Sequence, residues 1–321
     1  MKKNLISTLL TSVVIVLFGI YLYRNQQILT VIQNINILYE IAISLLFLLI
    51  FFLEGIFIKL TLNAFDKDID TKESYFLSIV SRIGNYLLPM RAGAVFRAMY
   101  LKKTYRFEYS KFLSTLYAYY ILLFFIYSVL GLIALFIKYV NSKVFFPVVT
   151  IFFVLLLLGT VLVIVFRKFE IKNVSKNKNI QKILSILNKF ISSWDNIVQK
   201  RNIFISLILL TTGNILVNWV IYIIEFKSLG IHINILDTLL YTCLSGVSLL
   251  VSITPGSLGI REAVFLFTSE SLGLTQDSIM QLAFVDRGIM YVLLLLLLLF
   301  IAVFVKRFKL KDIFFAREVI E

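Results

Sequence analysis

Two stretches of this sequence share one unusual pattern. They read GNYLLPMRAGAVFRAMYL at residues 84–101 and VSITPGSLGIREAVFLF at residues 251–267. Each contains the pattern P-x-x-x-G, which begins at Pro89 or Pro255 and is followed shortly by an arginine. Because proline cannot continue a helix from the preceding turn and glycine permits sharp turns, each pattern predicts a break within an apolar segment. We therefore expect broken helices over residues 74–101 and 236–267.

The composition of the chain places both breaks in a membrane. Of the 321 residues 60% are apolar and 16% are charged, and the mean hydropathy is +0.93. A membrane-spanning helix needs about 20 mostly apolar residues. Six uninterrupted segments qualify: Leu5–Leu22, Ile37–Ile58, Phe112–Ile137, Val144–Phe166, Ile203–Ile224 and Ile279–Val305. With the two broken segments they form eight hydrophobic elements, which predicts an all-α polytopic membrane protein.

The basic residues predict the orientation of the chain. If each broken segment is re-entrant, loops on one side of the membrane carry 23 Lys and Arg residues, and loops on the other side carry four. Basic residues are enriched in cytoplasmic loops. The count therefore predicts a multi-pass protein of the plasma membrane with both termini in the cytoplasm. Complete crossing of the broken segments is the alternative, but it moves the basic loop 102–111 outside.

The order helix, broken segment, helix occurs twice. Pro89 and Pro255 lie 166 residues apart, and the same shift superimposes the flanking apolar segments. We expect one integral membrane domain, residues 1–321, that contains two pseudo-repeats over about 37–137 and 203–305. The charge count gives the repeats opposite orientations. Inverted repeats with interrupted helices are typical of secondary transporters with a site near the midplane. Chance agreement of the spacing is the alternative.

Charged residues within the apolar segments indicate an anion site. The basic ones are all arginine: Arg82, Arg91, Arg97, Arg261 and Arg287. Three acidic residues lie well inside these segments: Glu54, Glu262 and Asp286. An unpaired charge in a membrane is costly, so the positive surplus favours an anionic ligand, and arginine suits bidentate binding of phosphate. For two of the five, Arg82 and Arg91, snorkelling to the interface is an equal alternative.

The breaks also present helix N-termini, whose free N–H groups bind anions, to the membrane interior. Polar residues at helical spacing run along three segments, which indicates a polar cavity or, equally, ordinary helix packing. They are Ser74, Ser78, Ser81 and Asn85, then Thr238, Thr242, Ser245 and Ser252, and Thr211, Asn214, Asn218 and Tyr222. A proline kink in a packed helix explains either break alone, but it explains the matched pair poorly.

The basic segment 167–202 predicts a cytoplasmic amphipathic helix. Its apolar residues fall along one side: Ile180, Ile183, Leu184, Leu187, Ile191, Trp194 and Val198. Such a helix binds the surface of an anionic membrane, which is the favoured interpretation, or a soluble partner.

The sequence contains no G-x-S-x-G, P-loop or H-E-x-x-H motif. The cluster Asp66, Asp68 and Asp70 has lysines interleaved, which favours a solvated loop over a metal site. We therefore expect no cofactor, no metal and no nucleic-acid partner, and a transporter rather than an enzyme.

The stretches RIGNYLLPMRAGAVFRAMYLKK and SITPGSLGIREAVFLF, followed by Arg287 in LAFVDRGIMYVLLLL, resemble the lysylphosphatidylglycerol synthase transmembrane-region family of flippase-like membrane proteins. The matching positions are Asn85, Pro89, Gly93, Arg97, Pro255, Gly256, Gly259, Arg261, Glu262 and Arg287. The chain departs from the family at Ala94, where a glutamate is common, and at Ser257, where a glycine is usual. We expect a stand-alone form without the soluble synthase domain, and the resemblance implies lipid translocation between leaflets.

The resulting hypothesis is a flippase-like transporter for an anionic phosphate-headgroup lipid, either a phospholipid or a lipid-linked intermediate. The expected substrate-binding residues are the matched positions together with Arg91. The alternative is a membrane enzyme or accessory subunit for polyprenyl-phosphate-linked sugar or aminoacyl-lipid synthesis, with chemistry at Glu54 or in the aspartate loop. The expected partners are the phosphate lipid, an anionic lipid surface at residues 167–202, and a glycosyltransferase or lipid synthase.

Overall fold

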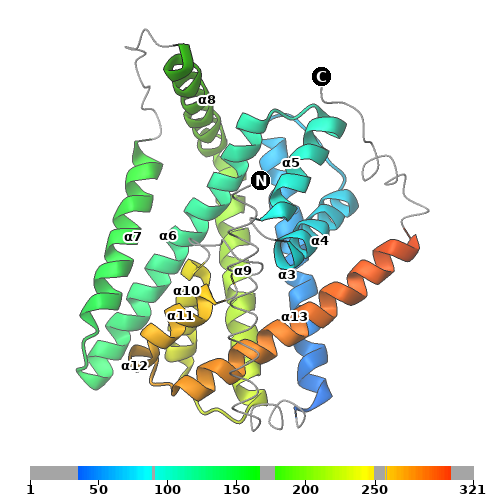
Figure 1. Ribbon diagram of the computed structural model, residues 1–321. Coiled ribbons are helices and arrows are strands. Elements are labelled where there is room, and N and C mark those ends of the chain that lie inside the picture. Colours follow the sequence, from blue (N-terminus) through cyan, green and yellow to red (C-terminus); the bar gives the residue numbers. More distant parts are fainter. Residues whose placement is uncertain (1–34, 89–90, 167–177, 249–256, 258, 305–321) are drawn as a thin grey trace.

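The computed structural model describes residues 35–88, 91–166, 178–248, 257 and 259–304 (Figure 1). Its helices are α3 (Ile37–Asn63), α4 (Thr71–Leu87), α5 (Ala92–Tyr105), α6 (Tyr109–Ser142), α7 (Pro147–Val165), α8 (Lys178–Gln199), α9 (Arg201–Ser228), α10 (Ile235–Val247), α11 (Ile260–Phe267), α12 (Ser269–Leu272) and α13 (Gln276–Phe304). The described residues contain no strand. The predicted span Leu5–Leu22 lies outside the described residues, as do Pro89, Pro255 and Gly256.

Five described helices are long and apolar enough to cross a membrane: α3, α6, α7, α9 and α13. They coincide with five of the predicted spans, which confirms the all-α polytopic membrane fold. Helix α7 shows why a membrane is required, because Leu155, Leu158 and Leu162 are all more than half exposed. A continuous apolar surface of this kind is stable against lipid tails and not against water.

Polar side chains set the starts of three helices. Asn36, Asp70 and Asn234 precede α3, α4 and α10, and each side-chain oxygen accepts a hydrogen bond from the N–H group two residues ahead, at 2.9, 3.3 and 3.0 Å. These bonds satisfy donors that the first turn of a helix leaves free. The helix boundaries therefore follow from local sequence.

The first broken segment forms a tight pair of helices, α4 and α5. The chain turns between them, and Arg91 starts α5 with a left-handed φ of 54°. A Cβ atom on Gly84 would stand 2.6 Å from the Cα of Gly93, and one on Gly93 would stand 1.9 Å from the carbonyl oxygen of Ser81. The two backbones therefore touch where both residues are glycine.

The second broken segment is also bent back on itself. Gly259 precedes α11 with a φ of 85°, in the region that favours glycine. The ring of Tyr241 in α10 stacks on that of Phe265 in α11, with centroids 3.9 Å apart and planes inclined by 11°. This aromatic stack holds α10 and α11 side by side.

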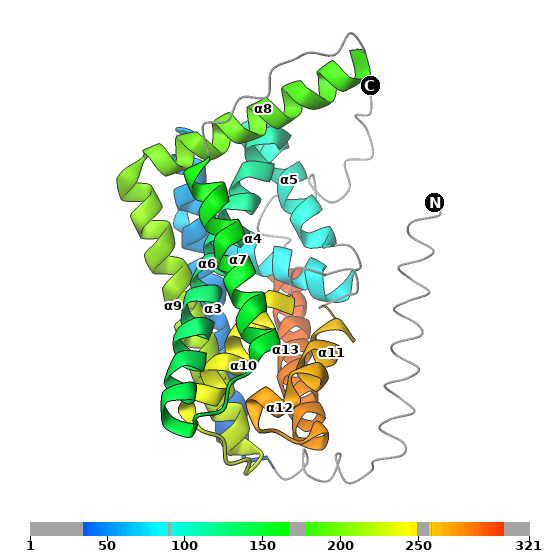
Figure 2. The same ribbon diagram turned by 90° about the vertical axis from the view of Figure 1, so that its left-hand side faces the viewer.

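The two helix pairs lie toward opposite ends of the molecule (Figures 1 and 2). Helices α4 and α5 lie toward the end that carries α8, and α10, α11 and α12 lie toward the other end. Helix α3 runs toward the α8 end and α6 runs away from it, whereas α9 runs away from that end and α13 runs toward it. These are the directions that an inverted repeat with re-entrant segments would give. Both the inverted repeat and the re-entrance stay predictions.

The second half of α8 packs against protein. Trp194 is 2% exposed, and its ring centroid lies 5.7 Å from that of Tyr117 in α6. Ile197 is fully buried in the same cluster, which also contains Phe57 and Leu207. This part of the predicted amphipathic side therefore covers α3, α6 and α9. Residues 167–177 of the basic segment lie outside the described part of the chain.

Candidate functional site

A cavity of about 190 Å³ is lined by residues of two groups of helices, which we call the first unit (α3 to α6) and the second unit (α9 to α13). Residues from α3, α4, α5, α6, α9, α10, α11 and α13 contribute to its wall, so both broken segments reach it. Members of all three predicted polar stripes line it: Ser81, Asn85, Asn214, Asn218, Tyr222, Thr242 and Ser245. Other stripe residues serve packing, as Ser78 does by donating a hydrogen bond to the carbonyl oxygen of Phe51 at 2.6 Å.

The cavity wall is positively charged. Four of the five arginines singled out in the sequence line it: Arg82, Arg91, Arg97 and Arg261. Two carboxylates do so as well, Glu54 and Asp286. Arg287 and Glu262 do not line the cavity. The lining charges therefore sum to an excess of two positive charges before any ligand is considered.

The charged residues of the second signature are paired with one another. Arg261 forms an ion pair with Asp286, and the two side chains are 10% and 5% exposed. Arg287 donates to Glu262 at 2.7 Å. The second carboxylate oxygen of Glu262 accepts the N–H of Gly259 at 2.7 Å, so this side chain also caps α11. The start of α11 thus already holds a negative charge.

The first signature is less completely neutralised. Glu54 of α3 is paired with Arg82 and also accepts a hydrogen bond from the hydroxyl of Tyr119 at 3.5 Å. The acidic group that acts on Arg97 is also the Glu54 carboxylate, which already forms an ion pair with Arg82. The Arg97 guanidinium lies 5.5 Å from the ring centroid of Phe112, and that of Arg91 lies 4.6 Å from Tyr120. Positive charge is therefore concentrated beside α5.

Two buried N–H groups on the cavity arginines await a partner. The Nε atoms of Arg97 and Arg261 are buried and have no hydrogen-bond partner among the described residues. A buried donor without an acceptor costs roughly 1 to 3 kcal/mol. Both arginines line the same cavity.

Two other predicted site residues position α5. The side-chain oxygen of Asn85 accepts the N–H of Ala94 at 3.3 Å, and Asn85 also lines the cavity. Gly93 does not line it; its missing side chain lets α5 lie against α4. Gly259 does not line the cavity either. It forms the turn before α11, and its N–H group donates to Glu262. Pro89, Pro255 and Gly256 lie outside the described residues.

A family model supports the same assignment over almost the entire chain. The model described as the lysylphosphatidylglycerol synthase TM region matches residues 4–297. The chain belongs to this family. No curated protein and no solved structure matches it. The family is a membrane domain with a lipid-related function, and the match spans both helix units of this multi-pass protein.

One buried acid in this family member was overlooked in the sequence. Glu225 lies one residue beyond the predicted span Ile203–Ile224, yet α9 continues to Ser228. Its side chain is 0% exposed, and neither carboxylate oxygen has a hydrogen-bond partner among the described residues. Asp286 and Arg261 are the charged groups that act on it. Its position one helical turn after Tyr222, on the face of the third polar stripe, was the available signal.

The aspartate loop has structural roles in this protein. Asp66 pairs with Lys200 at 3.0 Å, and Asp70 caps α4. Among the described residues, no group of three His, Cys, Asp or Glu side chains could hold a metal ion. The loop therefore ties α3 to the start of α9.

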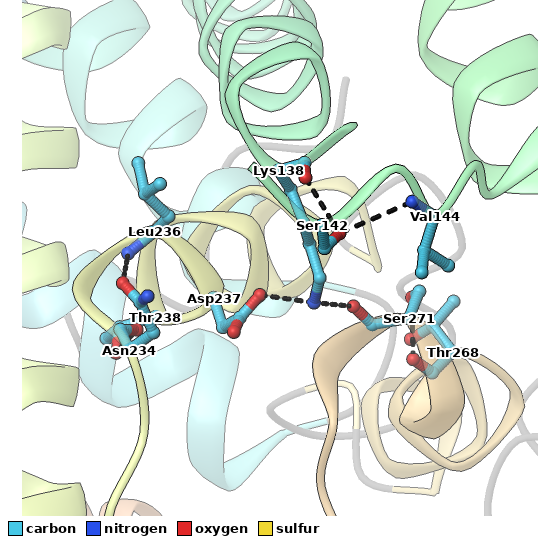
Figure 3. A network of polar contacts seen from close by, with 9 residues as sticks. All are labelled: Lys138, Ser142, Val144, Asn234, Leu236, Asp237, Thr238, Thr268 and Ser271. Atoms are coloured by element: carbon cyan, nitrogen blue, oxygen red, sulfur yellow. Dashed lines mark hydrogen bonds and ion pairs between the residues drawn. The ribbon is translucent and has the colours of Figure 1, made fainter. Parts of the chain in front are cut away.

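A second polar network joins α6 to α10 and α12 at the end of the molecule away from α8 (Figure 3). The Lys138 ammonium at the end of α6 donates to a carboxylate oxygen of Asp237 at 2.5 Å and to the carbonyl oxygen of Ser271 at 2.7 Å. The Lys138 and Asp237 side chains are about one-fifth exposed, at 20% and 19%. One side chain from the first unit thus holds α10 and α12 of the second.

Proposed function

We propose that this protein moves a lipid with an anionic phosphate headgroup between the two leaflets of the plasma membrane. The headgroup would occupy the cavity while the acyl chains stay in the bilayer. The observation that carries the proposal is the pair of unsatisfied Nε groups on Arg97 and Arg261 in one positively charged cavity.

The charge balance favours an anion over a neutral or cationic headgroup. Arg82 is paired with Glu54 and Arg261 with Asp286, and Arg97 adds a further positive charge to the cavity wall. Charge buried at membrane depth is costly unless it is compensated. A phosphate brings one or two negative charges and several acceptor oxygens, and guanidinium groups bind it in a bidentate manner.

The arrangement of the helices supports movement of the headgroup. The cavity is bordered by broken segments from units that run in opposite directions, as in transporters that expose one site alternately to either side. The lining amides and hydroxyls of Asn85, Asn214 and Ser245 offer further hydrogen bonds to a polar headgroup. The proposal includes cytoplasmic termini and contact of residues 167–202 with an anionic lipid surface. A lipid synthase or glycosyltransferase partner would supply or consume the lipid.

Reconstitution in proteoliposomes tests this proposal. A headgroup-labelled anionic phospholipid, and in parallel a labelled polyprenyl-phosphate sugar, is exposed to a membrane-impermeant quencher. We expect protein-dependent movement of one of them and a fall of about tenfold or more in Arg97→Gln, since a charge-assisted hydrogen bond contributes about 1.5 to 3 kcal/mol. The control Arg201→Gln removes an exposed arginine that does not line the cavity, and its rate should be unchanged.

Unchanged movement in folded Arg97→Gln protein contradicts the proposed phosphate site. Absence of movement for both lipids, together with a co-purifying synthase or glycosyltransferase, would favour the accessory-subunit alternative.

A further inference from the structure

Glu225 of α9 is a fully buried acid whose carboxyl group lies beside that of Asp286. It lies in the last turn of α9 with 0% exposure, between Tyr222 and Phe226, which belong to the largest apolar cluster. Neither of its oxygens accepts a hydrogen bond from a described residue. A carboxylate in such surroundings is strongly disfavoured relative to the neutral acid.

Its polar neighbours come from three other helices and supply a single cation. They are Tyr241 of α10, Arg261 of α11 and Asp286 of α13, with Tyr222 on α9 itself. The Tyr222 hydroxyl is engaged with Ser245 at 2.7 Å. On the other helices that pack against α9, the charged groups toward this end are Lys138 of α6, which pairs with Asp237, and Glu40 in the first turn of α3.

Arg261 therefore faces two carboxyl groups, of which Asp286 holds it in an ion pair. Two carboxylates that share one site cannot both ionise readily, and one of them retains a proton. With Glu225 neutral, the group formed by Arg261, Arg287, Glu262 and Asp286 sums to zero charge. With Glu225 ionised, these four residues and Glu225 together carry one negative charge.

We infer that Glu225 is a proton-binding site whose occupancy controls the availability of Arg261 to an anion in the cavity. The carboxylate takes up a proton from water to become a carboxylic acid, and releases it to water. An ionised Glu225 competes with Asp286 and with the ligand for Arg261. Proton and anion binding are then mutually favourable, because each ligand strengthens the binding of the other.

The use of this proton in transport rests on the proposed function, but the proton site itself does not. If the anion is a lipid phosphate, a proton gradient would bias its movement. No ATP-binding motif occurs in the sequence, so an ion gradient is the kind of driving force that remains available alongside the membrane potential and the lipid gradient.

Infrared difference spectroscopy of the full chain in phosphatidylcholine nanodiscs tests the site directly. A pH jump should reveal the carbonyl stretch of a buried protonated carboxyl group in the unmutated protein. Glu225→Gln, which mimics the neutral acid, should abolish this band, and Glu225→Asp should retain it at a shifted position. Asp237→Asn is the control, because that carboxylate is paired with Lys138, and the band should persist. A band that survives in Glu225→Gln overturns the inference.

Movement of the labelled anionic lipid in proteoliposomes tests the coupling. In the unmutated protein the rate should fall about tenfold as pH rises through the infrared titration, consistent with loss of one charge-assisted hydrogen bond. The rate in Glu225→Gln should not depend on pH in that range. Loss of the band with an unchanged pH profile of movement overturns the coupling. Loss of the band with no lipid movement in any variant leaves the proton site standing and rejects the proposed function.

Discussion

Arg287 of α13 donates from its Nε atom to a carboxylate oxygen of Glu262 in α11 at 2.7 Å, and the two side chains are 4% and 6% exposed. Arg287 also donates to the carbonyl oxygen of Ser257 at 3.4 Å. These contacts therefore fix the start of α11, and Ser257 three residues before it, against α13. This relationship assigns the second signature a positioning role beside the cavity, in addition to the contribution of Arg261 to its wall.

Removal of one partner of this pair should be more harmful than removal of both. We expect Arg287→Met to lower the free energy of unfolding by about 3 to 5 kcal/mol, because it leaves the Glu262 carboxylate buried without its cation. The double variant Glu262→Gln with Arg287→Met should recover part of that loss. Thermal unfolding in a mild detergent measures both. Equal destabilisation in the single and double variants would contradict this account.

The contact of α4 with α5 should tolerate no side chain at Gly93. In Gly93→Ala the new Cβ atom would meet the Ser81 carbonyl oxygen at 1.9 Å, so the helices must separate. We expect a loss of at least about 1 to 3 kcal/mol, the usual cost of overpacking. Gly159→Ala in α7 is the matched control, since nothing lies within 4 Å of its Cβ position, and alanine there should be neutral or stabilising. Similar melting temperatures for the two variants would be inconsistent with the close approach.

The Lys138 network should control access to Cys243, which is the only cysteine of the chain and is fully buried in α10. Lys138→Gln removes the ammonium that joins α6 to α10 and α12, so local opening of α10 should become more frequent. Alkylation of Cys243 by N-ethylmaleimide should then accelerate several-fold. The exposed Lys143, near the same end, supplies the control Lys143→Gln, whose rate should match the unmutated protein. Equal rates in all three would show that the network does not restrain α10.

Docking of α8 should depend on Trp194. Trp194→Ala removes a ring that is 2% exposed and contacts Tyr117 and Phe204, at a cost of about 3 to 5 kcal/mol. Lys189→Ala on the exposed side of α8 should have little effect. Hydrogen exchange across α8 distinguishes the two, because only the tryptophan variant should lose protection there. Unaltered protection in Trp194→Ala would mean that lipid, and not this packing, holds the helix.

The helices of this fold could be predicted from the sequence, because they depend on local properties. Hydropathy and length predicted the spanning helices, since any apolar segment of about 20 residues satisfies its backbone within one helix. Proline and glycine chemistry predicted the breaks near Pro89 and Pro255. Helical spacing also placed Asn85, Asn214 and Ser245 on the faces that line the cavity.

The distribution of the charges depends on tertiary packing and could not be predicted. Arg261 pairs with Asp286 and leaves its Nε free of partners among the described residues, whereas Arg97 lies over Phe112 with its acidic neighbour already occupied. The burial of Glu225 likewise depends on α9, α11 and α13, which meet although they are distant in the chain. Ion pairing and burial are properties of packed neighbours, so no local pattern could assign them.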